Sequence, residues 1–341
     1  MPATTLGYAE LTPQQVLESL DAVGLFGDGR LLQLNSYENR VFQVMLEDGR
    51  AVVAKFYRPG RWSDAQILEE HDFALELAAA EVPVVPPLVL QREARAGSAL
   101  QLLTEATPTL ALLEAGGHHF RYAVALRCAG REPELDDPAT LRQLGRFIGR
   151  LHAVGAQRPF AHRHRIDAAA DGRRSRTLLL DGGFVAAEQR AAWDAASAAA
   201  LAAVEAAFAR AGPLRALRLH GDCHIGNVLW RDGRPHVVDL DDACTGPAVQ
   251  DLWMLISGDA SSMASQLNLL LEGYETFMDF DDTERRLIEP LRTLRMLRYS
   301  AWLAERWTDP AFPAAFPFFG TPAYWAQQTS QMREQLEAMA D

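Results

Sequence analysis

Residues 218–242 read RLHGDCHIGNVLWRDGRPHVVDLDD. The acid Asp222 is followed five residues later by the amide Asn227, and a second acid, Asp239, comes twelve residues after that amide. Transfer of a phosphoryl group from a nucleotide needs one carboxylate at the attacking hydroxyl. It also needs an amide oxygen and another carboxylate to hold Mg²⁺ on the phosphates. This short stretch contains all three groups.

The same stretch predicts a tight hairpin. Residues 227–231 and 236–240 form apolar, strand-like runs, and the Asp-Gly dipeptide at 232–233 is a strong two-residue turn signal. A hairpin would return the chain beside itself and bring Asn227 and Asp239 close enough to share one cation. An amide and a carboxylate supply the hard oxygen ligands that Mg²⁺ prefers.

The spacing of these residues matches a known catalytic loop. Protein kinases carry H-R-D-x-x-x-x-N followed by D-F-G. Here the spacing from Asp222 to Asn227 is the same, Gly221 replaces the arginine, and Asp239 begins Asp-Leu-Asp in place of D-F-G. Any one of these residues alone is more typical of an ordinary turn. The joint match predicts that Asp222 and Asp239 are catalytic and that Asn227 and Asp239 hold the metal.

The catalytic stretch resembles the aminoglycoside phosphotransferase and choline kinase superfamily, which has a protein-kinase-like fold. Further segments look like the bacterial serine/threonine stress response kinases of the RdoA group. These segments are LNSYENRVFQV (34–44), VAKFYRPGRWSDAQILEEH (53–71), RLHGDCHIGNVLWRDG (218–233), VDLDDACTGPAVQDLWML (238–255) and IEPLRTLRML (288–297). The resemblance runs from about residue 10 to about residue 330, and it is weakest at 91–120 and 160–212.

The resemblance implies an α+β, bilobal, protein-kinase-like fold. Residues 1–130 would form a nucleotide-binding N-lobe with a small antiparallel β-sheet and a helix. Residues 131–341 would form a larger, mainly α-helical C-lobe that carries catalysis and binds the substrate. The extended segment 128–131 then fits the hinge between the lobes.

The resemblance also implies an enzyme, a kinase that uses ATP and Mg²⁺ to phosphorylate a Ser or Thr hydroxyl of protein, itself included. A small-molecule kinase acting on an aminoglycoside, choline or a homoserine-like alcohol would share the same core, so the motifs do not separate it. The other alternative is a nucleotide-binding regulator without turnover. The presence of Lys55, Asp222, Asn227 and Asp239 argues against a regulator.

Lys55 closes the apolar run 51–54 and precedes a predicted helix at 63–80. It corresponds to the kinase lysine that holds the α- and β-phosphates; the alternative is a solvated lysine at a strand end. An acid on the helix must pair with this lysine. Glu69 and Glu70 are the candidates, and the family spacing favours Glu70.

The segment NSYEN at 35–39 stands where protein kinases have a glycine-rich loop, but it contains no glycine. Backbone amides can still bind phosphates in a tight turn, and the Ser36 hydroxyl can donate as well. An ordinary polar hairpin turn fits the residues equally. The family resemblance favours contact between Ser36 and ATP.

Three further features stay open. Asp241 either gives a second metal contact or receives backbone hydrogen bonds. Asp251 resembles the family aspartate that braces the catalytic loop, and it also fits a helix N-cap. Cys223, beside Asp222, is a small buried residue or an oxidisable thiol. The histidines flanking Arg163 lack helical metal-pair spacing, so a solvated basic loop is predicted there.

Hydrophobic periodicity and turn residues predict the remaining elements. Helices are expected at 12–20, 137–152, 186–211 and from 289 onward; strands at 31–34, 40–46, 51–56, 109–113 and 121–127, with Gly116-Gly117 in the last turn; and loops at 91–108 and 160–183.

Composition limits which partners and which cellular location we expect for the protein. A net charge of −12 makes free nucleic acid a poor partner and is compatible with cationic or neutral substrates. Three cysteines in unrelated contexts predict reduced thiols and a cytoplasmic location. No apolar run approaches the ~20 residues of a membrane span, and the first residues lack the features of a signal peptide, so no membrane association is expected. We expect a monomer.

Overall fold

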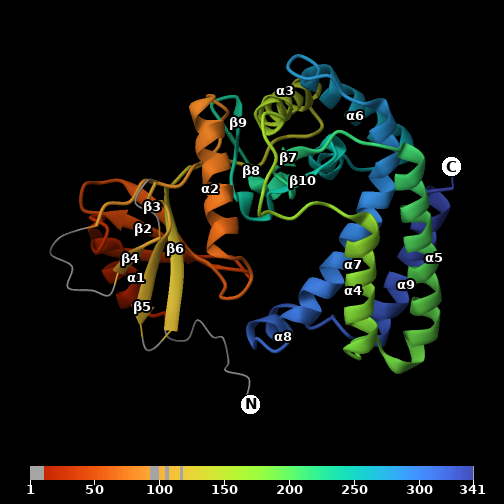
Figure 1. The fold of residues 1–341 in the computed structure, drawn as a ribbon, viewed down its shortest axis with the longest axis horizontal. Helices are drawn as coiled ribbons and strands as arrows, with labels where there is room; N and C mark the ends of the chain where they lie inside the picture. Colours follow the sequence, from red (N-terminus) through yellow and green to blue (C-terminus); the bar gives the residue numbers. More distant parts are fainter. Residues whose placement is uncertain (1–10, 93–99, 104–106, 116–117, 341) are drawn as a thin grey trace.

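A computed structural model describes residues 11–92, 100–103, 107–115 and 118–340. Its N-terminal part is a six-stranded antiparallel sheet in the order β1-β2-β3-β6-β5-β4 (Figure 1). The strands are β1 (Gly27–Leu34), β2 (Arg40–Leu46), β3 (Ala51–Phe56), β4 (Leu100–Leu102), β5 (Ala111–Ala115) and β6 (His118–Leu126). Helix α1 (Pro13–Asp21) precedes the sheet, and α2 (Asp64–Ala79) stands between the sheet and the rest of the chain.

The β2–β3 hairpin forms for the reasons seen in the sequence. Gly49 adopts a φ of 85° in the turn, which a residue without a Cβ does at no steric cost. Along β3 buried and half-buried residues alternate, as a strand with one face on a core requires. Val44, Val52 and Phe56 enter the core of the sheet, and Lys55 points to the opposite face from Phe56.

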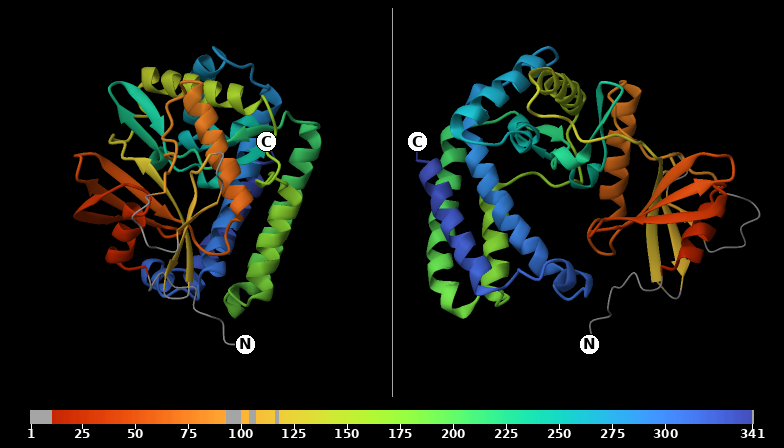
Figure 2. Two further views of the ribbon diagram at one scale, coloured as in Figure 1. Left: turned by 60° about the vertical axis from the view of Figure 1, so that its left-hand side comes forward. Right: turned by 180° about the vertical axis from the view of Figure 1, so that it is seen from behind.

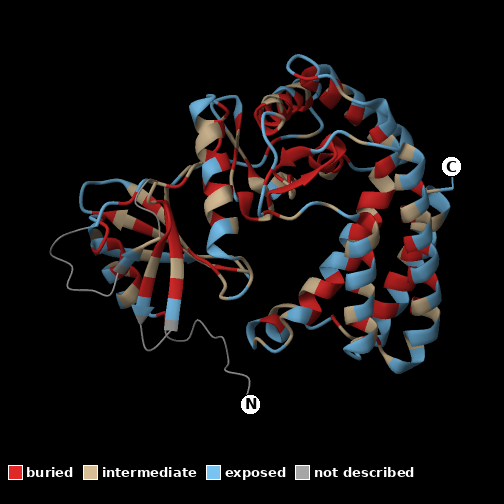
Figure 3. Ribbon diagram, viewed as in Figure 1, coloured by how far each residue is buried: buried red, intermediate tan, exposed pale blue. Residues whose placement is uncertain are grey.

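The remainder of the chain is mainly helical. Its helices are α3 (Pro138–Gly155), α4 (Ala168–Asp181), α5 (Ala187–Ala211), α6 (Ala260–Tyr274), α7 (Ile288–Glu305), α8 (Ala311–Ala315) and α9 (Pro322–Ala338). Seen from behind, the sheet and these helices lie at opposite ends of the molecule, on either side of α2 (Figure 2). The buried residues of the helices gather on the faces that they turn toward one another (Figure 3). These features confirm the α+β, protein-kinase-like fold.

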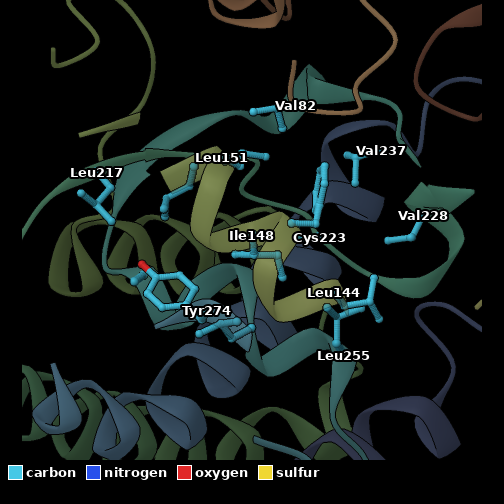
Figure 4. Close-up of a cluster of buried hydrophobic side chains, with 14 of the residues drawn as sticks. Val82, Leu144, Ile148, Leu151, Leu217, Cys223, Val228, Val237, Leu255 and Tyr274 are labelled. Atoms are coloured by element: carbon cyan, nitrogen blue, oxygen red, sulfur yellow. The ribbon is translucent and has the colours of Figure 1, made fainter. Parts of the chain in front are cut away.

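Helices α3 and α6 pack closely because glycine stands where they meet. A Cβ on Gly145 would lie 1.9 Å from the Leu270 carbonyl oxygen, and one on Gly273 would lie 2.0 Å from the Arg142 carbonyl oxygen. Leu144, Ile148 and Tyr274 of these helices belong to the main core, which Figure 4 shows in close-up. This pair of helices forms the floor below the predicted catalytic segment.

Two short strand pairs hold that segment. Strand β7 (Leu217–Leu219) pairs with β10 (Cys244–Gly246), and β8 (Val228–Arg231) pairs with β9 (Arg234–Val237). Asp232 and Gly233 both have positive φ, 50° and 74°, as a type I′ hairpin turn requires. The predicted hairpin is therefore confirmed.

Two predicted loops contain regular structure. Residues 160–183 include α4, which Asp167 caps by accepting a hydrogen bond from the Ala170 N–H at 2.9 Å. This helix was missed because its exposed face is rich in Arg and Asp, while its stability comes from packing on α5 and α7. Gly172 permits that packing, since a Cβ there would lie 2.3 Å from Leu201. The loop predicted at 91–108 contains β4, which is held by pairing with β5.

The other predicted elements agree with the structure to within a few residues, β1 differing most because it begins at Gly27, whereas helix α6 and strands β7 and β10 were not predicted. Thr12, Ser63 and Asp137 cap α1, α2 and α3 with side-chain hydrogen bonds. Arg131, in the predicted hinge, exchanges backbone hydrogen bonds with Trp230 at 3.1 and 2.6 Å. The predicted turn at Gly116-Gly117 and the N-terminal residues considered for a signal peptide lie outside the described residues.

Within the described residues, α5 is long and apolar enough to cross a membrane by length and composition alone, which the sequence analysis had not expected. The cause is its alanine content, which raises the mean hydropathy of a long helix without large apolar side chains. Helix α5 packs against α4, α7 and α9, and 39% of its most apolar window is buried. Core helices pass the same test, so it is weak evidence for a membrane span.

Candidate active site

The β8–β9 hairpin brings the three predicted residues of the catalytic segment together. The Val238 N–H donates to the Asn227 carbonyl at 3.1 Å, so Asp239 follows directly from the paired end of the hairpin. The Asn227 side-chain amide donates to the Asp222 carbonyl at 2.9 Å. His220 also bonds to the Val238 carbonyl through Nε2 at 3.0 Å. The loop and both hairpin ends are thus tied to one another.

The core below the loop fixes its position. Val228 and Val237, one from each hairpin strand, are buried beside Cys223 in the main core (Figure 4). Burial raises the pKa of the Cys223 thiol well above its ordinary value. A buried thiol in this state is unreactive. This environment favours the small buried residue over the redox thiol.

Asp251 braces the catalytic loop from beneath. Its two carboxylate oxygens accept hydrogen bonds from the backbone N–H groups of His220 and Gly221, both at 2.8 Å. The carboxylate also bonds to His152 Nε2 at 3.0 Å. Asp251 is 1% exposed and lies in a short 3₁₀ segment, Ala248–Asp251, where its side chain makes no N-cap bond. Of the two roles left open, the geometry is that of the brace.

The glycine in place of the kinase arginine has a local cause. Gly221 has a φ of 84°, and a Cβ there would lie 2.2 Å from the Asp242 carbonyl oxygen. Any larger residue would have to move the segment after Asp239. The departure from the kinase motif therefore reflects the close approach of two backbones.

Lys55 lies opposite the hairpin, at the end of β3. Its ammonium is 3.1 Å from Asp239 Oδ1 and 3.2 Å from Asp241 Oδ1, and it lies 5.0 Å from the centre of the Tyr57 ring. Burial opposes the positive charge, but the two carboxylates hold the pKa of Lys55 well above its ordinary value. Lys55 is thus a half-buried, charged group facing Asp239, and not a solvated lysine.

Asp241 is the centre of this ion-pair cluster. It is 3% exposed, and besides Lys55 it contacts Arg61 at 2.6 Å and accepts a hydrogen bond from the Asn39 side chain at 3.2 Å. Burial opposes its ionisation, yet Lys55 and Arg61 hold the pKa of Asp241 below its usual range. In the part of the chain that the structure describes, its carboxylate partners are side chains, so Asp241 is not the backbone acceptor, and a second metal contact stays a prediction.

The two glutamates of α2 have separate environments. Glu69 accepts hydrogen bonds from the backbone N–H groups of His162 and Arg163, both at 2.8 Å, and so anchors the loop before α4. Glu70 is buried, and burial raises its pKa to about 7 despite the nearby charge of Lys55. Among the described residues, the ion pairs of Lys55 go to Asp239 and Asp241, so the expected pair with Glu70 is not formed. Desolvation disfavours a charged Glu70, whereas Lys55 and Arg61 favour the charged form of Asp241 despite its burial.

The glycine-free turn at 35–39 is tied to the same cluster. The Ser36 hydroxyl accepts a hydrogen bond from the Asn39 N–H at 3.3 Å and thereby closes the turn. Asn39 is 3% exposed; its amide donates to Asp241, and its carbonyl accepts from the Arg58 N–H at 3.0 Å. No glycine is needed because side chains, and not a flexible backbone, hold this turn.

Asp222 lies at the other side of the site. Its carboxylate is bonded to Arg295 of α7 and lies 3.4 Å from His224 Nε2. Partial burial opposes ionisation, but the contacts with His224 and Arg295 hold the pKa of Asp222 below its usual range. His224, Arg292 and Arg295 line an adjoining cavity of about 330 Å³. An ionised carboxylate beside an open cavity can accept a hydrogen bond from an entering hydroxyl group.

Sequence reasoning missed Asn39, Arg61, Arg163 and Arg295. Arg163 was expected in a solvated basic loop, but it is buried, with Nε 2.8 Å from the Ala243 carbonyl and its guanidinium 4.2 Å from the Trp62 ring. These contacts join residues far apart in the chain, so no local spacing marks them. The only sequence signal was a set of arginines in an acidic protein.

The donor set suits a cation that also binds phosphates. In the described parts of the chain, no cluster of three or more His, Cys, Asp and Glu side chains could hold a metal alone. Asn227 and Asp239 offer an amide oxygen and a carboxylate that is 53% exposed. Such a site needs phosphate oxygens and water to complete it, as Mg²⁺ sites on nucleotides do.

The profile of the phosphotransferase enzyme family (APH) matches residues 30–288. The chain is 43% identical over 332 residues to "Serine/threonine protein kinase RdoA" of Salmonella typhimurium (strain LT2), which covers 97% of this chain and 94% of that protein. It is 42% identical over 334 residues to "Stress response kinase A" of Escherichia coli (strain K12), with 98% and 95% covered.

Solved structures share the fold at lower identity. A microcompartment-associated aminopropanol kinase superposes with a TM-score of 0.71 at 16% identity, covering 96% of this chain and 98% of that one. An amicoumacin kinase, solved in complex with AMP-PNP, Ca²⁺ and amicoumacin, gives a TM-score of 0.68 at 19% identity, with 95% and 93% covered.

Proposed function

The chain belongs to the APH phosphotransferase enzyme family and is a kinase with a hydroxyl acceptor, and from this premise we propose that it uses ATP and Mg²⁺ to phosphorylate Ser or Thr residues of protein, itself included. The names of the relatives at 42–43% identity support a protein acceptor. The observation that carries the proposal is that Lys55 and Asp239 face each other, 3.1 Å apart. The β8–β9 hairpin connects Asp239 to the loop that contains Asp222.

In this proposal Lys55 is the phosphate ligand. Its ammonium already lies in a half-buried, negatively charged setting, which keeps it protonated and oriented. Triphosphate oxygens would replace the carboxylate of Asp239 as its partner, while Asp241 keeps it in place. Ser36 and the backbone of its turn would contact the phosphates from the sheet side. Glu70 would affect Lys55 through its charge, which raises the pKa of the lysine, and not by direct contact.

Asn227 and Asp239 are the proposed metal ligands. The side-chain nitrogen of Asn227 donates a hydrogen bond to the Asp222 carbonyl. The side-chain oxygen of Asn227 is therefore the atom left to bind the metal. Asp239 is the more exposed of the two carboxylates beside Lys55. When bound, Mg²⁺ would supply positive charge against the charge that develops on the phosphate oxygens.

Asp222 is the proposed catalytic carboxylate. Because its pKa is held below the usual range, it is ionised at neutral pH and can accept a hydrogen bond from the acceptor hydroxyl. That bond orients the oxygen for in-line attack and gives the proton a place to go as the bond to phosphorus forms. Asp251, through the N–H groups of His220 and Gly221, keeps the loop in position.

The two lobes of the chain have different proposed roles. Residues 1–130 would bind the nucleotide, and residues 131–341 would carry Asp222 and the acceptor site. The three cysteines are free thiols, which supports a reducing compartment, and we propose the cytoplasm. A monomer suffices for this mechanism, because all proposed groups come from one chain.

Incubation with radiolabelled ATP, Mg²⁺ and a mixture of protein substrates tests the proposal. We expect label on serine or threonine of protein, and loss of that label with Asp239→Ala. A chain that labels only small alcohols from a metabolite mixture would be a small-molecule kinase. ATP binding without transfer to any acceptor would make it a nucleotide-binding regulator.

A further inference from the structure

The cavity beside Asp222 shows which chemical class of acceptor this site fits. Its volume is about 330 Å³, near the lower end for ligand sites, so it suits one or two side chains better than a whole folded surface. The lining residues are His224, Trp253, Met254, Ile256, Ser257, Gly258, Met263, Arg292 and Arg295. Through His224 and Arg295 the cavity reaches the Asp222 carboxylate.

The lining carries positive charge in an acidic protein. Of the described residues that line the cavity, two are arginines, one is a histidine and none is Asp or Glu. The whole chain has a net charge of −12, so this local sign is opposite to the background. Cationic groups around a small opening attract ligands of the opposite sign. Here they outnumber the two carboxylates with which the arginines pair, Asp222 and Glu289, only if His224 is protonated as well.

Arg292 is held in a defined orientation at the cavity wall. Its guanidinium carbon lies 5.6 Å from the centre of the Trp253 ring, and its NH1 group lies 3.4 Å from Glu289 Oε1. NH2 lies 3.4 Å from the sulfur of Met263. The ion pair with Glu289 is long, and the sulfur is a weak acceptor, so the guanidinium retains capacity for a stronger anionic partner.

Arg295 stands one helical turn further along α7. It is bonded to Asp222, and its side chain is 46% exposed. A guanidinium has five donors in a planar fork and can serve two carboxylates at once. Arg295 can therefore remain on Asp222 while it contacts an anion in the cavity. Together with Arg292 it forms a pair of cationic groups beside the site of proton transfer.

We propose that Arg292 and Arg295 bind a carboxylate or phosphate group of the acceptor, so that the preferred substrate is a Ser or Thr with an acidic side chain close to it in the polypeptide. This inference rests on the proposed function, which supplies the protein acceptor and the role of Asp222. It excludes cationic amino alcohols as good acceptors, because an ammonium would face two guanidinium groups in the cavity. Bidentate contact with arginine favours carboxylate and phosphate over neutral groups.

A peptide panel tests this. Each peptide contains one serine flanked by Glu, by phosphoserine, by Ala or by Lys, and transfer from radiolabelled ATP is measured as kcat/KM. We expect the acidic peptides to exceed the lysine peptides by about 10-fold or more, since like-charge contacts are strongly disfavoured at such sites. Arg292→Glu should reduce or reverse that ratio and leave the KM for ATP unchanged.

Two further variants separate recognition from folding. Arg292→Gln removes the charge without adding repulsion against Glu289, and it should flatten the preference while the thermal midpoint is retained. Arg174→Glu makes the same change of charge on α4, where the side chain is 80% exposed and does not belong to the cavity lining. It should leave the ratio unchanged.

The outcomes distinguish this inference from the proposed function. Equal labelling of acidic, neutral and lysine peptides would overturn the inference and leave the protein kinase intact. A ratio that Arg292→Glu and Arg174→Glu change equally would also overturn it, because the effect would then be one of net charge. Failure to label any peptide or protein, with small alcohols labelled instead, would overturn both.

Discussion

The two charged clusters of the site differ in their access to water. Around Lys55 one partner, Asp239, has a side chain that is 53% exposed, and the other is buried: Asp241 is 3% exposed, and Arg61 and Asn39 close over it from the sheet side. Around Asp222 the partners are open, with exposed fractions of 46% for the Arg295 side chain and 37% for that of His224. In the proposed mechanism the Lys55 cluster is the nucleotide end, which is largely assembled before the ligand arrives, and the Asp222 cluster is the acceptor end, which the substrate completes.

This difference suggests where specificity resides. A buried ion-pair cluster tolerates little change, because removal of one charge leaves another without a partner. An open cavity with exposed arginines can change its ligand through a few side chains without loss of the fold. Kinases of this family can therefore share the nucleotide end and differ at the acceptor end.

The largest expected effect breaks the acceptor end alone. Asp222→Asn keeps the shape of the side chain and removes the charge, so we expect kcat to fall by about 10³-fold, as for loss of a general base. Nucleotide affinity should stay within a factor of a few, because Lys55 and Asp239 are untouched. Steady-state kinetics and calorimetric titration with an ATP analogue measure the two quantities. Wild-type turnover in this variant would contradict the assignment of Asp222.

The next effect breaks the nucleotide end. Asp241→Asn leaves Lys55 and Arg61 short of a buried carboxylate, and we expect a loss of roughly 3 kcal/mol in the free energy of unfolding. Denaturant unfolding measures it. Asp242→Asn is the matched control, because Asp242 pairs with the same arginine but its side chain is 36% exposed, and its loss should stay within about 1 kcal/mol. Equal losses would show that burial does not set the cost.

A smaller effect concerns the loop that joins the two ends. Asp251→Asn retains one oxygen but not both acceptors, so one of the bonds to His220 and Gly221 is lost. We expect kcat to fall by about 10²-fold through misplacement of the loop. Asp259→Asn, at the N-cap of α6, is a control in which Asn caps as well as Asp. Unchanged kcat in Asp251→Asn would mean that the brace is not required.

The smallest effect is a dependence of stability on pH at the nucleotide end. Burial raises the pKa of Glu70 from 4.5 to about 7, so the folded chain binds this proton more tightly than the unfolded chain. Stability from this group is greatest below pH 4.5 and falls as the pH rises through 7. Glu70→Gln should flatten that decline between pH 5 and 8.

Thermal midpoints measured across this range give the comparison. Glu284 titrates near the same pH, because burial raises its pKa to about 7 as well. It is present in both proteins, so the difference between wild type and Glu70→Gln isolates Glu70. A wild type and variant with parallel pH profiles would show that Glu70 stays ionised.

Local patterns predicted much of this molecule. Strands β2 and β3 and the β8–β9 hairpin follow from apolar runs and turn residues, because these signals act over neighbouring residues. Helix α4 and strand β4 were missed, since each depends on a partner distant in sequence. Spacing predicted that Lys55 and the segment 218–242 belong to one site, and the structure brings them together, while their catalytic roles stay predictions.

The partners of the site residues could not be identified in this way. Glu69 and Glu70 are adjacent on α2, and only the loop at 161–163 determines which one faces Lys55. Arg295 contacts Asp222 across 73 residues, and Asn39 contacts Asp241 across 202. Such pairs follow from the fold as a whole, which no local pattern encodes.

A crystal structure with AMP-PNP and Mn²⁺, located by its anomalous scattering, tests the central claim most directly. The account predicts one Mn²⁺ bound by the Asn227 oxygen and the Asp239 carboxylate, and Lys55 moved from Asp239 onto the phosphates. It also predicts a γ-phosphate directed toward Asp222. Nucleotide bound elsewhere, or a metal site without Asn227 and Asp239, would contradict it.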